Sequence, residues 1–463
     1  MAEPVPAVLG LDVGTTEAKA AMVGLDGRLI GLGRAAYALD IGPDGRAEQD
    51  PRDWWAALSA AVRAIDTVGV EVRGICGVSQ GPTLVAVDDA GTPVRQAITW
   101  QDRRAGTGGF GLLPRIAWLA REDPASVVRA LWLLPAWDAL GLWLTGVAAT
   151  SLQAHETPPA AADLEAAGVR ADQVPAAQPI GTVLGGLRHA AAAALGLRSG
   201  TPVVAGVNDG TASMLGAGLL VAGDAVDTGG ASGGIAIYAD RPISVPGLYL
   251  APAPLPGRWV VGGAMAALGA SLDWLRSTVL GDRWALEALL AEAAAVPAGS
   301  DGLLFLPYLA GERAPIFDEG ARGAFAGLTL AHGRGHLVRA VLEGAAFAVR
   351  DVAEPLASAG APIAGLRLAG RPTPGDLWGR IKADVLGVPA IVPVVGETAV
   401  LGAAILAAAG VGAVPDLESG VGTMTAEARR LEPDPAHRVR YDEGFERYRA
   451  LYPALRGAGI GGS

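Results

Sequence analysis

The segment from Leu9 to Lys19 places a strand, a polar turn and a second strand in immediate succession. The apolar run Ala7–Leu11 leads to Asp12, and the run Ala18–Val23 follows a turn that holds Gly14, Thr15 and Thr16. A glycine-anchored turn of this kind can direct successive backbone N–H groups and small hydroxyls at an anion. Asp12 stands where a carboxylate could hold a divalent cation beside that anion. The segment therefore predicts a phosphate-binding loop with a metal-binding aspartate or, as the alternative, an ordinary hairpin turn.

Lysine is rare in this chain. Lys19 and Lys382 are the two lysines among 36 basic residues, and the remaining 34 are arginines. Lysine is a compact point charge that suits a phosphate oxygen, whereas arginine is a larger planar fork. Both lysines lie in segments that other patterns single out, although two occurrences can also coincide by chance. We therefore take Lys19 as a candidate for offsetting the charge of a bound phosphate.

Length, charge and cysteine content exclude several classes of protein. The chain has 463 residues, enough for two or three domains with sizeable cores. Its net charge of −11 argues against nucleic acid or an anionic membrane as the main partner. The single cysteine, Cys76, excludes an intrachain disulfide, and the five histidines lack metal-ligand spacing. The apolar stretches are too short to cross a bilayer, and no signal-peptide pattern opens the chain. We expect a soluble, cytoplasmic protein.

The order of strand and helix patterns predicts an α/β fold with a repeated architecture. Three short strands within residues 7–35, a helix opened by Asp50-Pro51 and a strand over 70–78 form the start of a ribonuclease-H-like unit. A similar order begins near residue 218 with a glycine-linked hairpin over 224–239. We expect domains at 1–217 and 218–463 with the active site in the cleft between them.

Further elements follow from local patterns. Residues 112–145 are expected to be helical, with interruptions at Pro124 and Pro135. Residues 335–354 are expected to form one long helix that ends before Pro355. Ile391–Val395 is a strand candidate, and Pro393 within it indicates an edge position.

Two signatures resemble known families. The first loop resembles that of the actin-like ATPase superfamily. Gly323–Leu328 and His336–Glu343, preceded by Gly311–Pro315, resemble the C-terminal signature of the FGGY carbohydrate kinases. This resemblance implies two actin-like domains, ATP and Mg²⁺ as cofactors, and a small sugar as substrate. His336 and Glu343 are expected to pack against neighbouring helices and not to bind a ligand.

The segment Gly206–Ala212 is similar to the part of the FGGY family that carries the general base. By that resemblance Asp209 accepts the proton of a sugar hydroxyl and contacts the substrate. The chemistry needs one carboxylate within hydrogen-bond reach of the attacking oxygen. The alternative for Asp209 is a turn aspartate before Gly210.

The nucleotide side shows two departures from the family pattern. Asp227–Gly234 stands in the place of the second phosphate loop, where Gly229, Gly230 and Ser232 supply donors and Ala231 lacks a hydroxyl. The adenine loop keeps Gly370, but Arg371 and Pro372 replace two glycines. Either Arg371 stacks on adenine as a planar cation or the pocket is narrowed. Glu397 opens a segment similar to the family's closing helix and is placed among the cofactor-binding residues.

Two stretches resemble the sugar-binding segments of the family. Thr99–Arg104 is similar to the Trp-x-Asp-x-Arg segment, and it implies Trp100, Gln101 and Asp102 as substrate-binding residues. Gly77–Thr83 corresponds to a stretch in which xylulose kinases carry a histidine, and here that histidine is replaced by Gln80.

The combined patterns indicate an ATP-dependent kinase for a small sugar, with a ketopentose such as xylulose as the first candidate. A polyol or a sugar acid is the alternative substrate. A sugar- or nucleotide-binding regulator that has lost kinase activity is the rival from another class, supported by Ala231 and Arg371-Pro372. A chaperone-like ATPase fits the first loop alone. The family resemblance also implies a possible homodimer.

Overall fold

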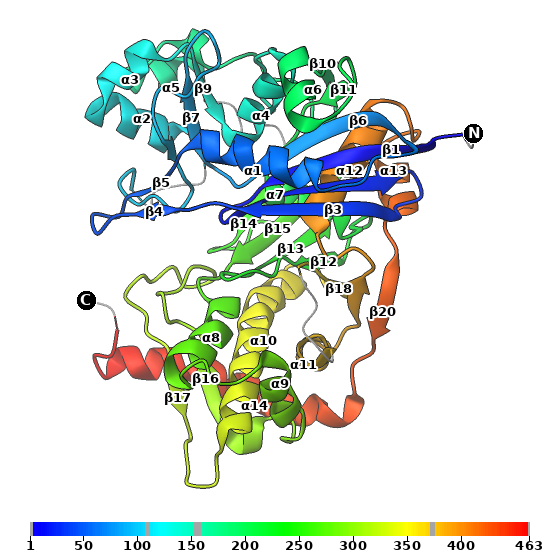
Figure 1. Cartoon of the computed structure of the whole chain (residues 1–463). Helices are drawn as coiled ribbons and strands as arrows, with labels where there is room; N and C mark the ends of the chain where they lie inside the picture. The colour runs from blue at the N-terminus through cyan, green and yellow to red at the C-terminus, as the bar shows by residue number, and fades with distance from the viewer. Residues whose placement is uncertain (1–2, 107–110, 152–158, 371–375, 462–463) are drawn as a thin grey trace. The chain divides into compact units, whose positions relative to one another are not determined.

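The computed structural model describes residues 3–106, 111–151, 159–370 and 376–461. Contacts between residues divide the chain into two compact units (Figure 1). Unit 1 comprises Met1–Gly218 and Glu397–Thr425, and unit 2 comprises Leu219–Gly396 and Ala426–Ser463. Residues 397–425, which the sequence-based boundary assigned to the second domain, therefore group with unit 1.

The main sheet of unit 1 combines antiparallel and parallel strands. Its order within the described residues is β10-β11-β6-β1-β2-β3. These strands span Val183–Gly186, Pro202–Val204, Val70–Ser79, Val5–Val13, Glu17–Gly24 and Leu29–Ala36. Strands β1, β2 and β3 are mutually antiparallel, while β6 runs parallel to β1 and β11 runs parallel to β6. The hairpin predicted around residues 12–19 is confirmed, with Asp12 opposite Lys19 in the register of β1 and β2.

Helices pack against this sheet through apolar and glycine-rich faces. Helix α1 (Pro51–Arg63) begins at Asp50, whose carboxylate accepts a hydrogen bond from Arg52 N as the predicted N-cap. Helix α12 (Thr398–Gly410) packs against β1 and against α7 (Asp209–Gly216). The other helices of unit 1 with seven or more residues are α2 (Leu113–Glu122), α4 (Ala136–Thr145), α6 (His189–Leu195) and α13 (Leu417–Met424).

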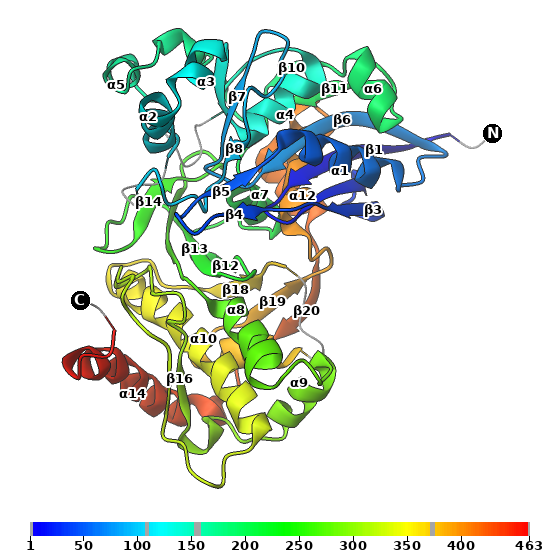
Figure 2. The ribbon, with the colours of Figure 1, turned by 60° about the vertical axis from the view of Figure 1, so that its left-hand side comes forward.

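A second, smaller sheet in unit 1 has the order β4-β5-β8-β7-β9. Its strands span Asp40–Ile41, Ala47–Gln49, Ala97–Ile98, Leu84–Val87 and Trp132–Pro135. Helices α2, α3 (Pro124–Arg129) and α5 (Ala161–Ala166) gather beside β7 and β9 (Figure 2). The helical prediction for residues 112–145 is wrong at Trp132–Pro135, because these residues pair with β7. Long-range pairing overrides the local apolar pattern there.

The main sheet of unit 2 repeats the arrangement of unit 1. Its order in the described part of the chain is β14-β15-β13-β12-β18-β19-β20. These strands span Tyr249–Pro252, Trp259–Ala264, Gly234–Ala239, Asp224–Asp227, Gly365–Leu368, Ala390–Pro393 and Glu427–Leu431. Strands β15, β13 and β12 are antiparallel, and β18 and β19 extend the sheet in parallel, as β6 and β11 do in unit 1. Each unit thus has the mixed α/β sheet of the predicted fold class.

Two local predictions in unit 2 are wrong for identifiable reasons. Strand β19 is not an edge strand, since it pairs with β18 on one side and β20 on the other. A register shift between Val392 and Pro393 accommodates the proline in the ladder with β20. Helix α10 (Arg334–Ser358) continues through Pro355 to Ser358.

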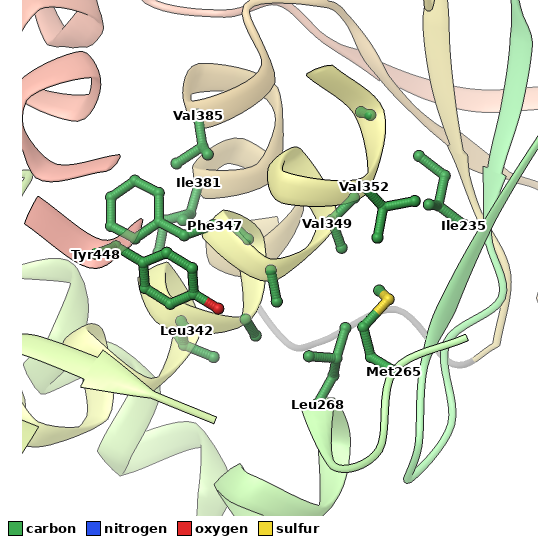
Figure 3. Close-up of a cluster of buried hydrophobic side chains, with 14 of the residues drawn as sticks. Ile235, Met265, Leu268, Leu342, Phe347, Val349, Val352, Ile381, Val385 and Tyr448 are labelled. Atoms are coloured by element: carbon green, nitrogen blue, oxygen red, sulfur yellow. The ribbon is translucent and has the colours of Figure 1, made fainter. Parts of the chain in front are cut away.

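The core of unit 2 forms around α10. Figure 3 shows Phe347, Val349 and Val352 of this helix among apolar side chains from the sheet and from the neighbouring helices. Phe347 packs against Tyr448 at 5.5 Å between ring centroids. The other elements are α8 (Leu268–Trp274), α9 (Leu286–Ala294), α11 (Leu377–Leu386), α14 (Arg438–Gly457) and the hairpin of β16 (Leu304–Leu306) and β17 (Ala324–Ala326). Among the residues that the structure describes, no helix is both long and apolar enough to span a bilayer.

The contact between α7 and α12 predicts a strong response to one added methyl group. A Cβ at Gly402 would lie 1.9 Å from the backbone oxygen of Ala212, and a Cβ at Gly216 would lie 1.9 Å from that of Thr398. Gly402→Ala is expected to lower the free energy of unfolding by about 1–3 kcal/mol, because neither backbone can yield without moving its helix. Urea unfolding measures this change. Gly457→Ala, where a Cβ meets no atom within 4 Å, is the control and is expected to be neutral or slightly stabilising. Equal effects of both substitutions would contradict the close packing.

Candidate active site

The first group of candidate residues lies at the carboxyl ends of three parallel strands in unit 1. Asp12 is on β1, Gln80 follows β6, and Asp209 follows β11 at the start of α7. Gln80 N donates to Val13 O at 2.8 Å, and Ser79 forms a parallel bridge with Asn208. The topology therefore brings together residues that are almost 200 positions apart in the sequence.

Asp12 is a buried residue, and one of its carboxylate oxygens has no hydrogen-bond partner in the described structure. Its residue is 3% exposed, and its Oδ1 atom has no hydrogen-bond partner among the described residues. Burial, together with the nearby Asp209 carboxylate, raises the pKa of Asp12 to about 7. The described residues hold no cluster of three or more histidine, cysteine or acidic side chains that could bind a metal alone. Magnesium often binds through one or two carboxylates plus phosphate oxygens, and Asp12 fits that mode.

Asp209 is held in place by the first turn of α7. The side chain of Asn208 caps the helix by accepting a hydrogen bond from Thr211 N at 2.8 Å. The Asp209 carboxylate accepts from Gly210 N at 2.8 Å. Burial raises the pKa of Asp209 to about 6. A carboxylate with such a pKa can take up a proton near neutral pH, as a general base must.

Lys19 lies in a cluster of charges beside these two aspartates. Its Nζ is 2.9 Å from Glu397 Oε2 and 3.6 Å from Glu17 Oε1, and Arg34 pairs with both glutamates. Burial opposes the charge of the ammonium group, but Asp12 and Glu397 together raise the pKa of Lys19 above its ordinary value. Lys19 is therefore a cation beside Glu397, and its contact with a phosphate stays a prediction.

The first loop is supported by side chains outside the motif. Tyr37 OH donates to Gly14 O, Gln49 Nε2 donates to Thr15 O at 2.8 Å, and Trp100 Nε1 donates to Thr15 Oγ1 at 3.0 Å. Thr16 is exposed. Trp100, predicted as a wall of the sugar site, thus contacts the phosphate loop. Tyr37 and Gln49 were not predicted as site residues, because their role depends on contacts with a loop that is distant in the sequence.

The predicted sugar-binding residues differ in how many of their polar atoms already have hydrogen-bond partners. Asp102 is buried, and its two oxygens accept hydrogen bonds from Ala47 N at 3.0 Å and from Arg104. Burial opposes ionisation, but the bonds from Arg104 hold the pKa of Asp102 below its usual value. Gln80 donates to Gln49 Oε1 at 2.7 Å and keeps an unpartnered, buried Oε1 in the described structure. Gln80 is thus the better-placed acceptor for a ligand, and Gln101 is half-buried.

Unit 2 contains a cavity of about 100 Å³ at the predicted nucleotide loops. Gly229, Gly230 and Gly370 line it, as expected for cofactor-binding residues. Ser232 is not among the lining residues, and its backbone oxygen accepts from Leu268 N. Arg371 and Pro372 lie outside the described residues. Asp227, Trp378 and Lys382 line the cavity as well and were not predicted as site residues.

The signature at residues 311–343 is largely internal to unit 2. Glu343 accepts hydrogen bonds from Ser300 Oγ, Arg339 Nε and Tyr441 OH, so its carboxylate is fully engaged in packing. His336 pairs at 3.2 Å with Asp301. Both observations agree with the expected packing role.

The described chain resembles known proteins over nearly its whole length. The profiles of the FGGY family of carbohydrate kinases match residues 7–108 (N-terminal domain) and 226–411 (C-terminal domain). The xylulose kinase of Bacillus subtilis is 29% identical over 96% of each chain. The glycerol kinase of Thermus brockianus is 30% identical over 88% of this chain and 90% of its own. The crystal structure of xylulose kinase from Rhodospirillum rubrum matches with a TM-score of 0.84, 30% identity and coverage of 97% and 99%.

The support of the first loop by Gln49 predicts a measurable loss of stability. Gln49 is 2% exposed, and its side chain bonds to Thr15 O, Ala38 O, Trp54 Nε1 and Gln80 Nε2. Gln49→Leu is expected to lower the free energy of unfolding by about 3 kcal/mol, because it leaves buried polar groups without partners. Chemical denaturation measures the change. The exposed Gln96→Leu is the control, and a loss no larger than the control's would contradict this role.

Glu312 predicts a pH-dependent difference in stability. It is 3% exposed, its Oε1 accepts from Ala266 N and Arg313 N, and its buried Oε2 has no partner in the described residues. Burial raises the pKa of Glu312 to about 7 from 4.5. The folded state therefore holds the proton more tightly than the unfolded state. The protein loses stability as the pH rises from about 4.5 to about 7, because the folded state must then bury a charged carboxylate.

We expect the difference in free energy of unfolding between Glu312→Gln and the wild type to change in favour of the variant by roughly 2–3 kcal/mol between pH 5 and pH 8. The reason is that the uncharged amide does not ionise. Denaturation curves at several pH values measure the difference. The exposed Glu446→Gln should show no such trend, and a pH-independent difference for Glu312→Gln would contradict the raised pKa.

Proposed function

Because this chain belongs to the FGGY family of carbohydrate kinases and is a phosphotransferase with an alcohol group as acceptor, we propose that its acceptor is a ketopentose such as xylulose. The observation that carries the mechanism is the pair of carboxylates at the carboxyl ends of β1 and β11 in unit 1, the buried Asp12 and the half-buried Asp209, both with raised pKa values. Their environments suit two different tasks.

Asp209 acts as the general base. Its raised pKa, about 6, lies near the operating pH of an intracellular reaction and leaves the carboxylate mostly unprotonated at pH 7. As the sugar oxygen forms a bond to the γ-phosphorus of ATP, the bond from that phosphorus to the bridging oxygen breaks and ADP leaves, while the proton of the hydroxyl passes to the Asp209 carboxylate. In-line positioning of the two oxygens supplies most of the remaining rate enhancement.

Asp12 holds Mg²⁺, directly or through water. Its unpartnered Oδ1 and its unfavourable burial as a lone charge are the features that a divalent cation satisfies. When bound, Mg²⁺ neutralises charge on the phosphate oxygens. Gly14, Thr15 and Thr16 then offer backbone and hydroxyl donors to the same phosphates, and Lys19 offsets the remaining charge.

The cavity of unit 2 binds the nucleotide. Gly229, Gly230 and Ser232 approach the phosphates, and Gly370 borders the base. Within unit 1, Glu397 acts by holding Lys19 in an ion pair at 2.9 Å.

The sugar contacts Gln80, Trp100, Gln101 and Asp102. Gln80 Oε1 is a buried acceptor without a partner in the described residues, whereas Asp102 acts mainly by fixing Arg104. Xylulose kinases are among the relatives with 29% identity over nearly the full length, which favours a ketopentose. A polyol is the second candidate, favoured by the 30% identity to a glycerol kinase.

Removal of the base is expected to abolish turnover. Asp209→Asn should lower kcat by about 10³-fold without lowering the free energy of unfolding, because the amide keeps the acceptor for Gly210 N, does not ionise, and cannot take up a proton. A coupled assay of ADP release with Mg-ATP and a panel of ketoses, polyols and aldonates measures kcat. The exposed Asp163→Asn is the matched control and should retain full activity.

The same assay tests the substrate. A kcat/KM for D-xylulose above that for every polyol and aldonate supports the proposal. A higher value for glycerol or another polyol would replace the ketopentose. Wild-type turnover by Asp209→Asn would contradict the assignment of the base.

A further inference from the structure

A buried ion pair lines the cavity of unit 2. Lys382 Nζ on α11 lies 2.5 Å from Asp227 Oδ2 at the end of β12, and the two side chains are 9% and 2% exposed. Bringing two charges out of water costs about as much as their attraction returns, so such a pair contributes little net stability over apolar residues. Its presence at a ligand cavity therefore calls for an explanation other than folding energy.

Asp227 connects the two loops of the cavity. Its Oδ1 accepts a hydrogen bond from Gly229 N at 2.9 Å, and its backbone oxygen accepts from Ala369 N at 2.9 Å. One oxygen of the carboxylate thus holds the Gly229-Gly230 turn, and the other is held by Lys382. The neighbouring strands β13 and β18 fix its backbone on both sides.

The intrinsic preferences of Gly229 and Gly230 do not by themselves fix the backbone conformation of their turn. Gly229 and Gly230 have φ values of +61° and +77°, and glycine adopts many other conformations at similar cost. A Cβ at Gly229 would lie 2.6 Å from Ala369 O, so the two loops approach too closely for any other residue. Backbone hydrogen bonds hold the residues on either side, and the bond from Gly229 N to the Asp227 carboxylate holds the start of the turn itself.

Lys382 lines the cavity, and its ammonium group contacts Asp227. Its Nζ lies 4.3 Å from the centroid of the Trp378 ring, one helical turn earlier on α11. The ammonium is thus held between a carboxylate and an aromatic face. Its charge is already balanced by Asp227, so it acts on a ligand mainly through the loop that Asp227 holds.

We propose that the Asp227–Lys382 pair is a positioning device that fixes the Gly229-Gly230 turn so that its backbone N–H groups point at the nucleotide phosphates. This inference rests on the proposed nucleotide site of unit 2. It assigns Lys382 and Asp227 to nucleotide affinity without direct contact to the sugar.

Calorimetric titration of Mg-ADP into the full-length wild type, Asp227→Asn, Lys382→Met and the double variant tests the proposal. Each single variant is expected to raise the Kd for ADP about 10-fold, the effect of losing one charged hydrogen bond. The double variant should resemble the single variants, because the three proteins lack the same pair. KM for ATP should rise in parallel, with KM for the sugar unchanged.

Two results would overturn the proposal. If Lys382 instead contacts phosphate directly, Asp227→Asn frees the ammonium, and the Kd for ADP stays equal or falls. If the pair is merely structural, both variants lower Tm and leave the Kd unchanged, as expected for the control Asp442→Asn, which breaks a pair with Arg350 that does not line the cavity. Failure of the wild type to bind ADP would contradict the proposed function together with this inference, whereas unchanged Kd values in the variants contradict the inference alone.

Discussion

The arrangement of unit 1 depends on the close approach of α12 to β1 and α7. A Cβ at Gly10 would lie 2.1 Å from Val400 O, and Gly216 and Gly402 allow the two helix backbones to touch. Because α12 begins directly after Glu397, this packing brings Glu397 to Lys19 at 2.9 Å. It also sets the start of α7, where Asp209 lies, against the ends of the parallel strands. Glycines at a few positions therefore determine where the side chains of Glu397, Lys19 and Asp209 lie.

Those charges are out of balance, and the imbalance has chemical consequences. Asp12, Asp209, Glu17 and Glu397 stand against the two cations Lys19 and Arg34. The two cations form ion pairs with the two glutamates, and burial raises the pKa of Asp12 to about 7 and that of Asp209 to about 6. A divalent cation beside Asp12 would remove much of the cost. Carboxylates with raised pKa values lower the stability of the fold, and such groups are typical of functional sites.

Sequence reasoning succeeded where the signal is local. The strand–turn–strand at residues 7–23, the Asp50 cap and the hairpin of β12 and β13 depend on neighbouring residues and were predicted. It failed where distant segments decide. The β9 strand forms because β7 pairs with it, β20 turns β19 into an interior strand, and residues 397–425 return to unit 1. The contacts of Tyr37 and Gln49 with the first loop, the pairing of Asp227 with Lys382 and the partners of Asp102 join segments that are distant in the sequence, so the local patterns did not predict them.

The central proposal is that this protein transfers a phosphoryl group to a sugar hydroxyl with Asp209 as the general base. Phosphorus NMR of a reaction with Mg-ATP and D-xylulose observes this transfer directly. The account predicts a sugar phosphate monoester formed in equal amount to ADP by the wild type, and none by Asp209→Asn. Inorganic phosphate as the sole new phosphorus product, or a monoester formed equally fast by Asp209→Asn, would contradict it.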